Sequence, residues 1–173
     1  MAVRTILHYP DPRLRAPGKK VSALTEELHR LIDDMAETMY AAPGVGLAAT
    51  QVGEGWQIFV VDCAAEGEAS DLRVFVNPEI LELEGTTSFE EGCLSFPGAR
   101  EEVERAEKVR VRAQDREGRW FELVAEGLLA IAIQHEYDHL HGVLMIDHIG
   151  PLKKRLLHRK MLKRSEPGAS ASG

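Results

Sequence analysis

Apolar residues recur at helical spacing in two stretches of the chain. Within residues 25–41 they fall every three or four positions, as on one buried helix face, and they are Leu28, Leu31, Ile32, Met35 and Met39. Thr25 is a suitable N-cap for this helix, and Pro43 follows its last turn. Residues 126–141 form the second stretch, whose apolar face includes two histidines before Gly142 ends the pattern. Both stretches are predicted to be helices.

Other stretches have the patterns of β-strands. Residues 56–62 form a continuous apolar run typical of a buried strand, and residues 73–76 form another that we expect to stop at Asn77-Pro78. Residues 108–113 alternate between apolar and polar, and a turn leads from them into residues 119–123, which predicts a hairpin with one solvated face. Strands that precede a central helix without regular βαβ alternation indicate an α+β fold with mainly antiparallel sheets.

Length and composition are those of an ordinary globular protein. The chain has 173 residues, of which 44% are hydrophobic and 28% charged, so disordered and fibrous classes are excluded. We expect one compact domain over residues 1–164 and a disordered tail over residues 165–173. No run approaches the roughly 18 apolar residues of a membrane span, and the first residues lack the pattern of a secretory signal. The sequence therefore predicts a cytoplasmic protein with no membrane or DNA partner.

Charge is unevenly distributed along the chain. Residues 1–150 carry 14 Lys and Arg against 27 Asp and Glu, a balance of −13, whereas the last 23 residues carry +6. Leucines at helical spacing among the basic residues of 151–164 predict a basic amphipathic C-terminal helix. Two interpretations stay open at this point. The helix either packs on the acidic body with a solvated basic face, or binds a polyanion such as ribosomal RNA.

The chemistry is concentrated in the second predicted helix, within residues 135–139 (HEYDH). Residues four apart lie on one helix face, so His135 and His139 can direct two imidazoles at one divalent ion. Glu136 follows the first histidine and can reach water at that ion. Asp138 faces another side of the helix, where we expect it to contact another residue of this protein, in a supporting role, rather than the metal. These residues alone fit several kinds of hydrolase, because the third ligand decides the chemistry.

Two further segments make the chain recognisable, namely residues 44–51 (GVGLAATQ) and 91–95 (EGCLS). Together with residues 135–139 they resemble the three signature motifs of the peptide deformylases, in the same order and without a departure inside any motif. The similarity continues through residues 105–109 and 126–130 and extends over nearly the whole chain.

Cys93 completes the predicted metal site. One thiolate and two imidazoles leave a fourth position open, which is typical of catalytic rather than structural sites. Because a thiolate lowers the net charge of the site, we expect its water to need a base, and Glu136 is the candidate. The resemblance implies Fe²⁺ as the metal, while the ligand types are also compatible with Zn²⁺, Ni²⁺ or Co²⁺. Cys63 is predicted to be a small core thiol.

The resemblance also implies the reaction, which is hydrolysis of N-formylmethionyl nascent peptides to formate and a free N-terminal methionine. Glu136 would take a proton from water and return it to the departing amine. The resemblance assigns stabilisation of the oxyanion to the Gln51 side chain and the Leu94 backbone N–H, and such donors typically contribute about 3 kcal/mol each. The two glycines in residues 44–51 allow the backbone to approach a ligand closely.

Seven residues are predicted to bind substrate, and they are Val45, Gly46, Phe89, Gly92, Arg100, Leu128 and Ile131. The four large apolar side chains are expected to line a pocket for methionine, with ordinary core packing as the alternative. Arg100 is expected to hold the part of the peptide that follows the methionine. The backbone groups of Val45, Gly46 and Gly92 are expected to pair with an extended substrate.

Three other functions stay open from the sequence. A zinc protease would need an oxygen or nitrogen as its third ligand, and the motif around Cys93 argues against it. A metal or thiol sensor would keep Cys93 and both histidines but would need neither Glu136 nor Gln51. A deformylase-like ribosome-binding factor would act through residues 151–164.

Overall fold

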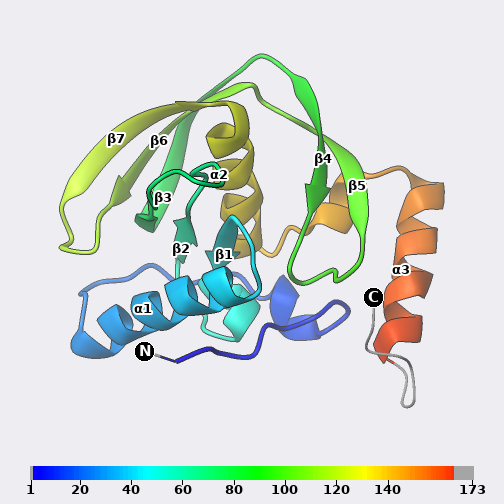
Figure 1. The fold of residues 1–173 in the computed structure, drawn as a ribbon, viewed down its shortest axis with the longest axis horizontal. Helices are drawn as coiled ribbons and strands as arrows, with labels where there is room; N and C mark the ends of the chain where they lie inside the picture. Colours follow the sequence, from blue (N-terminus) through cyan, green and yellow to red (C-terminus); the bar gives the residue numbers. More distant parts are fainter. Residues whose placement is uncertain (1, 166–173) are drawn as a thin grey trace.

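The computed structural model describes residues 2–165 and places one helix at the centre of the other elements (Figure 1). The helices are α1 (Glu26–Ala41), α2 (Gly127–Leu140) and α3 (Pro151–Ser165), and the short 3-10 helices are η1 (Pro12–Arg15), η2 (Ala49–Val52) and η3 (Met145–His148). The strands are β1 (Gly46–Ala48), β2 (Ile58–Val61), β3 (Arg73–Glu84), β4 (Thr87–Gly92), β5 (Arg100–Arg105), β6 (Lys108–Gln114) and β7 (Trp120–Glu126).

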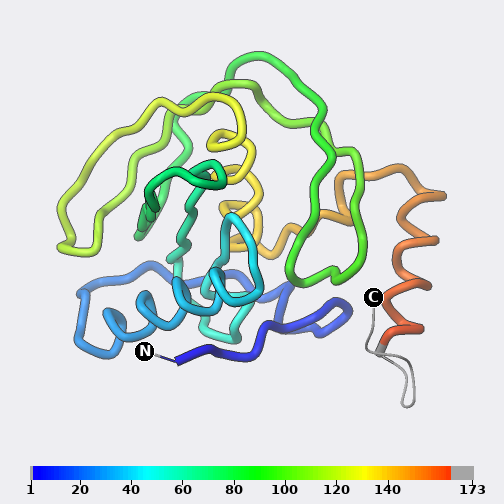
Figure 2. The backbone as a smooth tube through the Cα atoms, in the orientation of Figure 1, coloured from blue at the N-terminus to red at the C-terminus, as the bar shows by residue number. Residues whose placement is uncertain are grey.

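The strands form one large and one small antiparallel sheet. The large sheet has the order β1-β2-β3-β6-β7, and β4 pairs with β5 alone. Helix α2 lies between the large sheet and the β4–β5 pair, and the tube in Figure 2 shows that this pair stands away from the large sheet. The predicted α+β class, with mainly antiparallel sheets around the metal-binding helix and a C-terminal helix, is confirmed.

Both predicted long helices are present. The Thr25 hydroxyl accepts a hydrogen bond from the Leu28 N–H at 3.3 Å, which caps α1 as predicted. The apolar stripe of α1 is buried against residues of β1 and β2. Helix α2 is buried on most sides, as expected of a helix at the centre of a fold, and Gly142 follows it with a φ of +74°.

The strand predicted over residues 73–76 does not stop at Asn77-Pro78. Strand β3 continues to Glu84, so this boundary was wrong. The register with β6 shifts between Val76 and Glu79, and Asn77 adopts a φ of +51° inside that irregularity. A proline in a bulge removes no regular ladder bond, which is why the strand tolerates it. The Asn77 side chain also bonds both backbone groups of Val21, at 2.7 and 2.8 Å.

The predicted hairpin is present as β6 and β7, paired from Lys108↔Glu126 to Gln114↔Trp120. The bounds of strands β1, β4 and β5 were not predicted. Strand β1 has only three residues, and β4 and β5 carry charged or polar residues on both faces, which hides the alternation of a half-buried strand.

The basic C-terminal helix is present as α3. Leu157 and Met161 pack into a cluster with Phe96, whereas Leu152 and Leu156 are exposed, so only part of the apolar stripe faces the body. Helix α3 includes Ser165, one residue beyond the predicted end, and residues 166–173 of the predicted tail lie outside the described residues. Among residues 2–165, no helix is both long and apolar enough to span a membrane.

Candidate functional site

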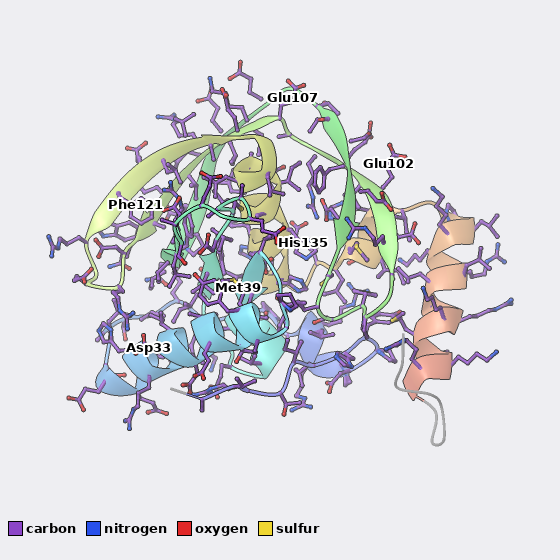
Figure 3. The ribbon with its side chains drawn as sticks, viewed as in Figure 1. Asp33, Met39, Glu102, Glu107, Phe121 and His135 are labelled. Atoms are coloured by element: carbon purple, nitrogen blue, oxygen red, sulfur yellow. The ribbon has the colours of Figure 1, made fainter. Side chains whose placement is uncertain are left out.

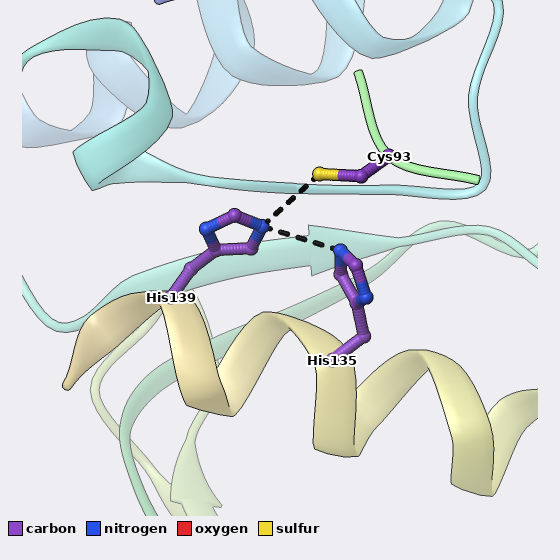
Figure 4. A group of neighbouring side chains, drawn as sticks. All are labelled: Cys93, His135 and His139. Atoms are coloured by element: carbon purple, nitrogen blue, oxygen red, sulfur yellow. Dashed lines mark hydrogen bonds between the residues drawn. The ribbon is translucent and has the colours of Figure 1, made fainter. Parts of the chain in front are cut away.

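Cys93, His135 and His139 meet at one point in front of α2 (Figure 4). The two Nε2 atoms of the histidines are 3.2 Å apart, and the Cys93 Sγ is 3.4 Å from the His139 Nε2. All three ligand atoms lie within 4.8 Å of one another. The four-residue spacing on α2 and the position of Cys93 directly after β4 bring them together, as the sequence predicts.

The donor set fits a single divalent metal ion. Two ring nitrogens and one sulfur face one another, and this combination suits zinc, iron, cobalt or nickel. Burial lowers the pKa of His139 well below its usual value, whereas Cys93 and Glu91 outweigh burial and raise the pKa of His135. The neutral imidazole of His139 is the form that binds metal. Figure 3 shows His135 in the middle of the molecule, between the large sheet and the β4–β5 pair. These three residues therefore form a candidate metal centre.

Glu136 is a buried carboxyl beside this centre. It is 4% exposed, and its Oε1 atom has no hydrogen-bond partner within residues 2–165. Burial raises its pKa to about 7, because the charged form loses its hydration. A carboxyl with this pKa can both accept and return a proton near neutral pH, as general acid–base catalysis requires.

His135 is oriented by a carboxylate that the sequence analysis did not single out. The Nδ1 atom of His135 lies 2.9 Å from the Glu91 Oε1, which leaves its Nε2 for a metal. Arg105 forms two further bonds to Glu91, from Nε at 2.7 Å and from Nη2 at 3.0 Å. Burial would raise the pKa of Glu91, but the hydrogen bonds from Arg105 and His135 lower it to about 2.

The Gln51 amide is held in one orientation. Its Oε1 accepts from the Ala48 N–H at 3.0 Å, and its Nε2 donates to the Ser95 hydroxyl at 3.0 Å. The same Nε2 is 3.8 Å from the Cys93 Sγ, so the amide N–H group faces the metal centre. Leu94 packs beside this region, and a Cβ at Gly44 would lie 2.9 Å from its Cδ1.

A cavity of about 860 Å³ opens over the centre, and the structure places all seven predicted substrate-binding residues in its wall. Gln51, Cys93, Leu94, His135 and Glu136 line it too. Ile131 is 5% exposed and Leu128 is 39% exposed, so the apolar wall runs from the interior to the surface. Val45 and Phe89 also lie at the surface. The cavity is therefore large enough, and apolar enough, for an unbranched side chain.

The sequence profile described as polypeptide deformylase matches residues 3–155. The chain belongs to this family. It is 52% identical over 168 residues to the peptide deformylase of Alkalilimnicola ehrlichii, covering 97% of this chain and 94% of that protein. It is 51% identical to that of Chromobacterium violaceum, covering 96% of this chain and 98% of that protein.

Solved deformylase structures have the same fold. The peptide deformylase of Legionella pneumophila matches with a TM-score of 0.88 and 47% identity, over 96% of this chain and all of that one. The deformylase of Ehrlichia chaffeensis in complex with actinonin matches with a TM-score of 0.91 and 32% identity, over 96% of this chain and all of that one. The resemblance of the three motifs, the fold and the enzymatic nature of the chain are confirmed.

Deformylases remove N-formyl groups from nascent peptides and use one metal ion. The predicted hydrolase therefore stands, and the protease and sensor alternatives lose their support.

The structure also shows the surroundings of Asp138 and Cys63. Asp138 contacts Arg105 and His148, so it has partners within the protein, as expected. Cys63 is half-buried against the core, and burial raises the pKa of its thiol to about 11.

Sequence reasoning missed three polar residues around the candidate metal centre: Glu91, Ser95 and Arg105. The first two lie inside the second motif, each two residues from Cys93, but the motif does not show which side chains they contact. Arg105 lies 14 residues from Glu91, and only the pairing of β4 with β5 brings the two together.

Proposed function

We propose that this chain hydrolyses the formyl amide of N-formylmethionyl peptides in the cavity beside Cys93, His135 and His139, with Glu136 as the general base. The observation that supports it most strongly is the buried Glu136 carboxyl, which has one oxygen without a protein partner next to a three-ligand metal centre. A buried carboxyl oxygen with no partner among the described residues, in a substrate-sized cavity, is placed for proton transfer rather than for stability.

The metal would be held by Cys93, His135 and His139. When bound, it supplies a Lewis acid that polarises the formyl group and makes water a better nucleophile. Glu91 keeps the His135 ring in the orientation that presents Nε2 to the centre. We propose Fe²⁺ as the physiological ion, with Zn²⁺, Ni²⁺ or Co²⁺ able to replace it.

Glu136 carries the proton through the reaction. It takes a proton from water, the resulting hydroxide attacks the formyl carbon, and the C–N bond then breaks. Glu136 returns the proton to the departing nitrogen, so formate and a free N-terminal amine are the products. A pKa near 7 suits both halves of this cycle.

Two donors would stabilise the oxyanion. The Gln51 Nε2 faces the centre because Ala48 and Ser95 fix the orientation of the amide. The Leu94 N–H follows Cys93 directly in the chain and would be the second donor. Donors that are already in place need no reorganisation during the reaction, which is the source of their effect on the barrier.

The cavity wall would select methionine. Phe89, Leu128 and Ile131 supply apolar surface for its side chain, with Val45 at the mouth. The backbone of Val45, Gly46 and Gly92 would pair with the extended peptide. Such pairing does not depend on the side chains of the peptide. Arg100 would lie beside the peptide further on. Many residues would therefore be accepted after the methionine.

The proposed substrate also indicates where in the cell the protein acts. We propose that residues 1–164 act as one catalytic domain in the cytoplasm, where translation supplies formylated chains.

We further propose that α3 contacts the ribosome. Lys154 and Lys160 contact Asp147 and the Gly98 carbonyl of the body, whereas Leu152 and Leu156 are exposed among further basic residues. Basic residues next to exposed leucines suit a surface of RNA and protein.

Replacing Lys153, Arg155 and Arg159 by glutamate tests the contact without removing α3. The expected result is loss of salt-dependent ribosome co-sedimentation, with unchanged turnover of a free formylated peptide. Retained co-sedimentation would contradict the contact. The Lys154 and Lys160 contacts with the body stay intact in this variant.

Glu136→Gln tests the proposed mechanism. We expect the variant to hold as much metal as the wild type and to lose formate release by about 1,000-fold or more, because the general base is gone. The matched control is Glu126→Gln, which alters an exposed carboxylate at the start of the same helix. Full deformylation by Glu136→Gln would refute the assigned mechanism.

A further inference from the structure

Asp138 is the residue before the metal-binding His139, but its side chain belongs to a different group of contacts. Its Oδ2 accepts from the Arg105 Nη1 at 2.6 Å and lies 2.8 Å from the His148 Nε2. His148 lies in η3, after the end of α2, and Arg105 ends β5. Asp138 therefore joins three elements behind the metal centre.

Arg105 links Asp138 to the metal centre. Its side chain is only 4% exposed and lies between two carboxylates, Glu91 on one side and Asp138 on the other. Glu91 in turn receives the Nδ1 of His135 on the same Oε1 that accepts from the Arg105 Nη2. An unbroken set of contacts thus runs from His148 through Asp138, Arg105 and Glu91 to the first histidine ligand.

The shared Oε1 of Glu91 makes the balance of charge important. Arg105 and His135 both draw on this carboxylate, and Asp138 supplies a second negative charge to Arg105. Without Asp138, a buried guanidinium would be balanced by Glu91 alone and would hold it more tightly. Less of the carboxylate would then be available to orient the His135 ring and to increase its strength as a ligand.

We infer that Asp138, itself held by His148, is a positioning residue that acts through Arg105 and Glu91 on His135 and sets how firmly the site retains its metal. This inference rests on the metal centre assigned in the proposed function. The outer end of the group borders a separate cavity of about 460 Å³ behind α2, lined by Arg105, Asp138 and His148 among others. The Asp138 and His148 side chains are 24% and 29% exposed, so substituting them opens no cavity in the apolar core.

The test is the rate of metal release. Wild-type protein, Asp138→Asn and His148→Gln are loaded with Co²⁺, an excess of chelator is added, and the visible absorption of the Co²⁺–thiolate centre is followed. We expect release to be about 10-fold faster in Asp138→Asn, at the lower end of the effect typical of residues that support a metal ligand. We expect a smaller acceleration in His148→Gln.

Asp33→Asn is the control for the loss of an ion pair elsewhere in the protein. It removes a carboxylate from an ion pair with Arg116 of nearly the same length, 2.7 Å, on α1 and far from the metal centre in Figure 3. Its release rate should equal that of the wild type. Equal acceleration in Asp33→Asn and Asp138→Asn would show a general loss of stability and would overturn the inference.

A second comparison separates positioning from a purely structural role. In a Glu91→Gln background the link to His135 is already weakened, so Asp138→Asn should add little further acceleration. An undiminished effect in that background, or unchanged release in Asp138→Asn alone, overturns the inference while leaving the proposed function standing. If the wild type itself retains no metal, the proposed metal centre fails, and this inference fails with it.

Discussion

Gly46 lies directly against the carboxylate of Glu136. A Cβ atom at position 46 would be 2.6 Å from the Glu136 Oε2 and 3.0 Å from its Cδ. Strand β1, which contains Gly46, pairs with β2 and packs against α2, so neither backbone can move aside easily. The absence of a side chain at this position therefore gives the proposed base its place in the cavity.

Gly46→Ala should displace the Glu136 carboxylate without changing the metal ligands. We expect kcat for a formyl-Met peptide to fall by about 100-fold, the size of effect that a displacement of about 1 Å produces at a reacting group. The metal content should stay at the wild-type level. Gly55→Ala is the control, because a Cβ there would meet nothing within 4 Å. Wild-type kcat in Gly46→Ala would show that the position of this carboxylate is not critical.

Gln51→Glu should remove the amide donor while keeping the oxygen that accepts from Ala48. We expect kcat to fall by about 100-fold with little change in KM, as for the loss of one oxyanion donor. Steady-state kinetics with metal-loaded protein measures both constants. Gln57→Glu changes a glutamine that bonds a backbone carbonyl away from the cavity and should have wild-type kinetics. A fall in Gln51→Glu confined to KM would argue against the assigned role.

Ile131→Phe should shorten the methionine pocket from its buried end. The ratio of kcat/KM for formyl-Met over formyl-Ala peptides should drop by about 10-fold or more, because the longer side chain loses apolar contact. Leu129→Phe adds the same volume to a neighbouring position that lines a different cavity, next to Cys63. An unchanged ratio in Ile131→Phe would place the methionine elsewhere.

Glu136 should cost the metal-free protein stability above neutral pH. Its pKa rises from 4.5 to about 7 on folding, so the folded state binds the proton more tightly. The free energy of unfolding then falls as pH rises from about 4.5 to 7, by about 3 kcal/mol. Metal-free Glu136→Gln should therefore be more stable than the wild type at pH 8 and nearly equal to it below pH 4.5. Denaturant unfolding at both pH values measures this, and equal stability at pH 8 would contradict it.

The sequence predicts the parts of the fold that have a strong apolar period. Helices α1 and α2 are found where their stripes lie, because burying such a stripe needs only one correct face. The apolar pattern does not predict strands β4 and β5, because their charged residues face solvent or one another and leave no period to detect. The predicted end of β3 is wrong because Pro78 is typical of a strand break, whereas the bulge at Asn77 lets the strand continue past the proline.

The sequence likewise predicts some residues of the candidate site and not others. The metal ligands and Glu136 can be predicted because their chemistry depends on spacing within one helix and on short motifs. Arg105 and Ser95 cannot, because their roles arise from contacts between elements. A buried arginine between two carboxylates and a hydroxyl that orients an amide have no local pattern.

In the proposed mechanism, a metal held by Cys93, His135 and His139 and the base Glu136 together hydrolyse a formyl amide. Its most direct test is formate release from a formyl-Met peptide by protein purified without oxygen, with the metal content measured on the same sample. We expect formate in proportion to about one metal ion per chain, loss of activity in air for the iron form, and survival of activity with Ni²⁺ or Co²⁺. No formate with any divalent metal would contradict the account.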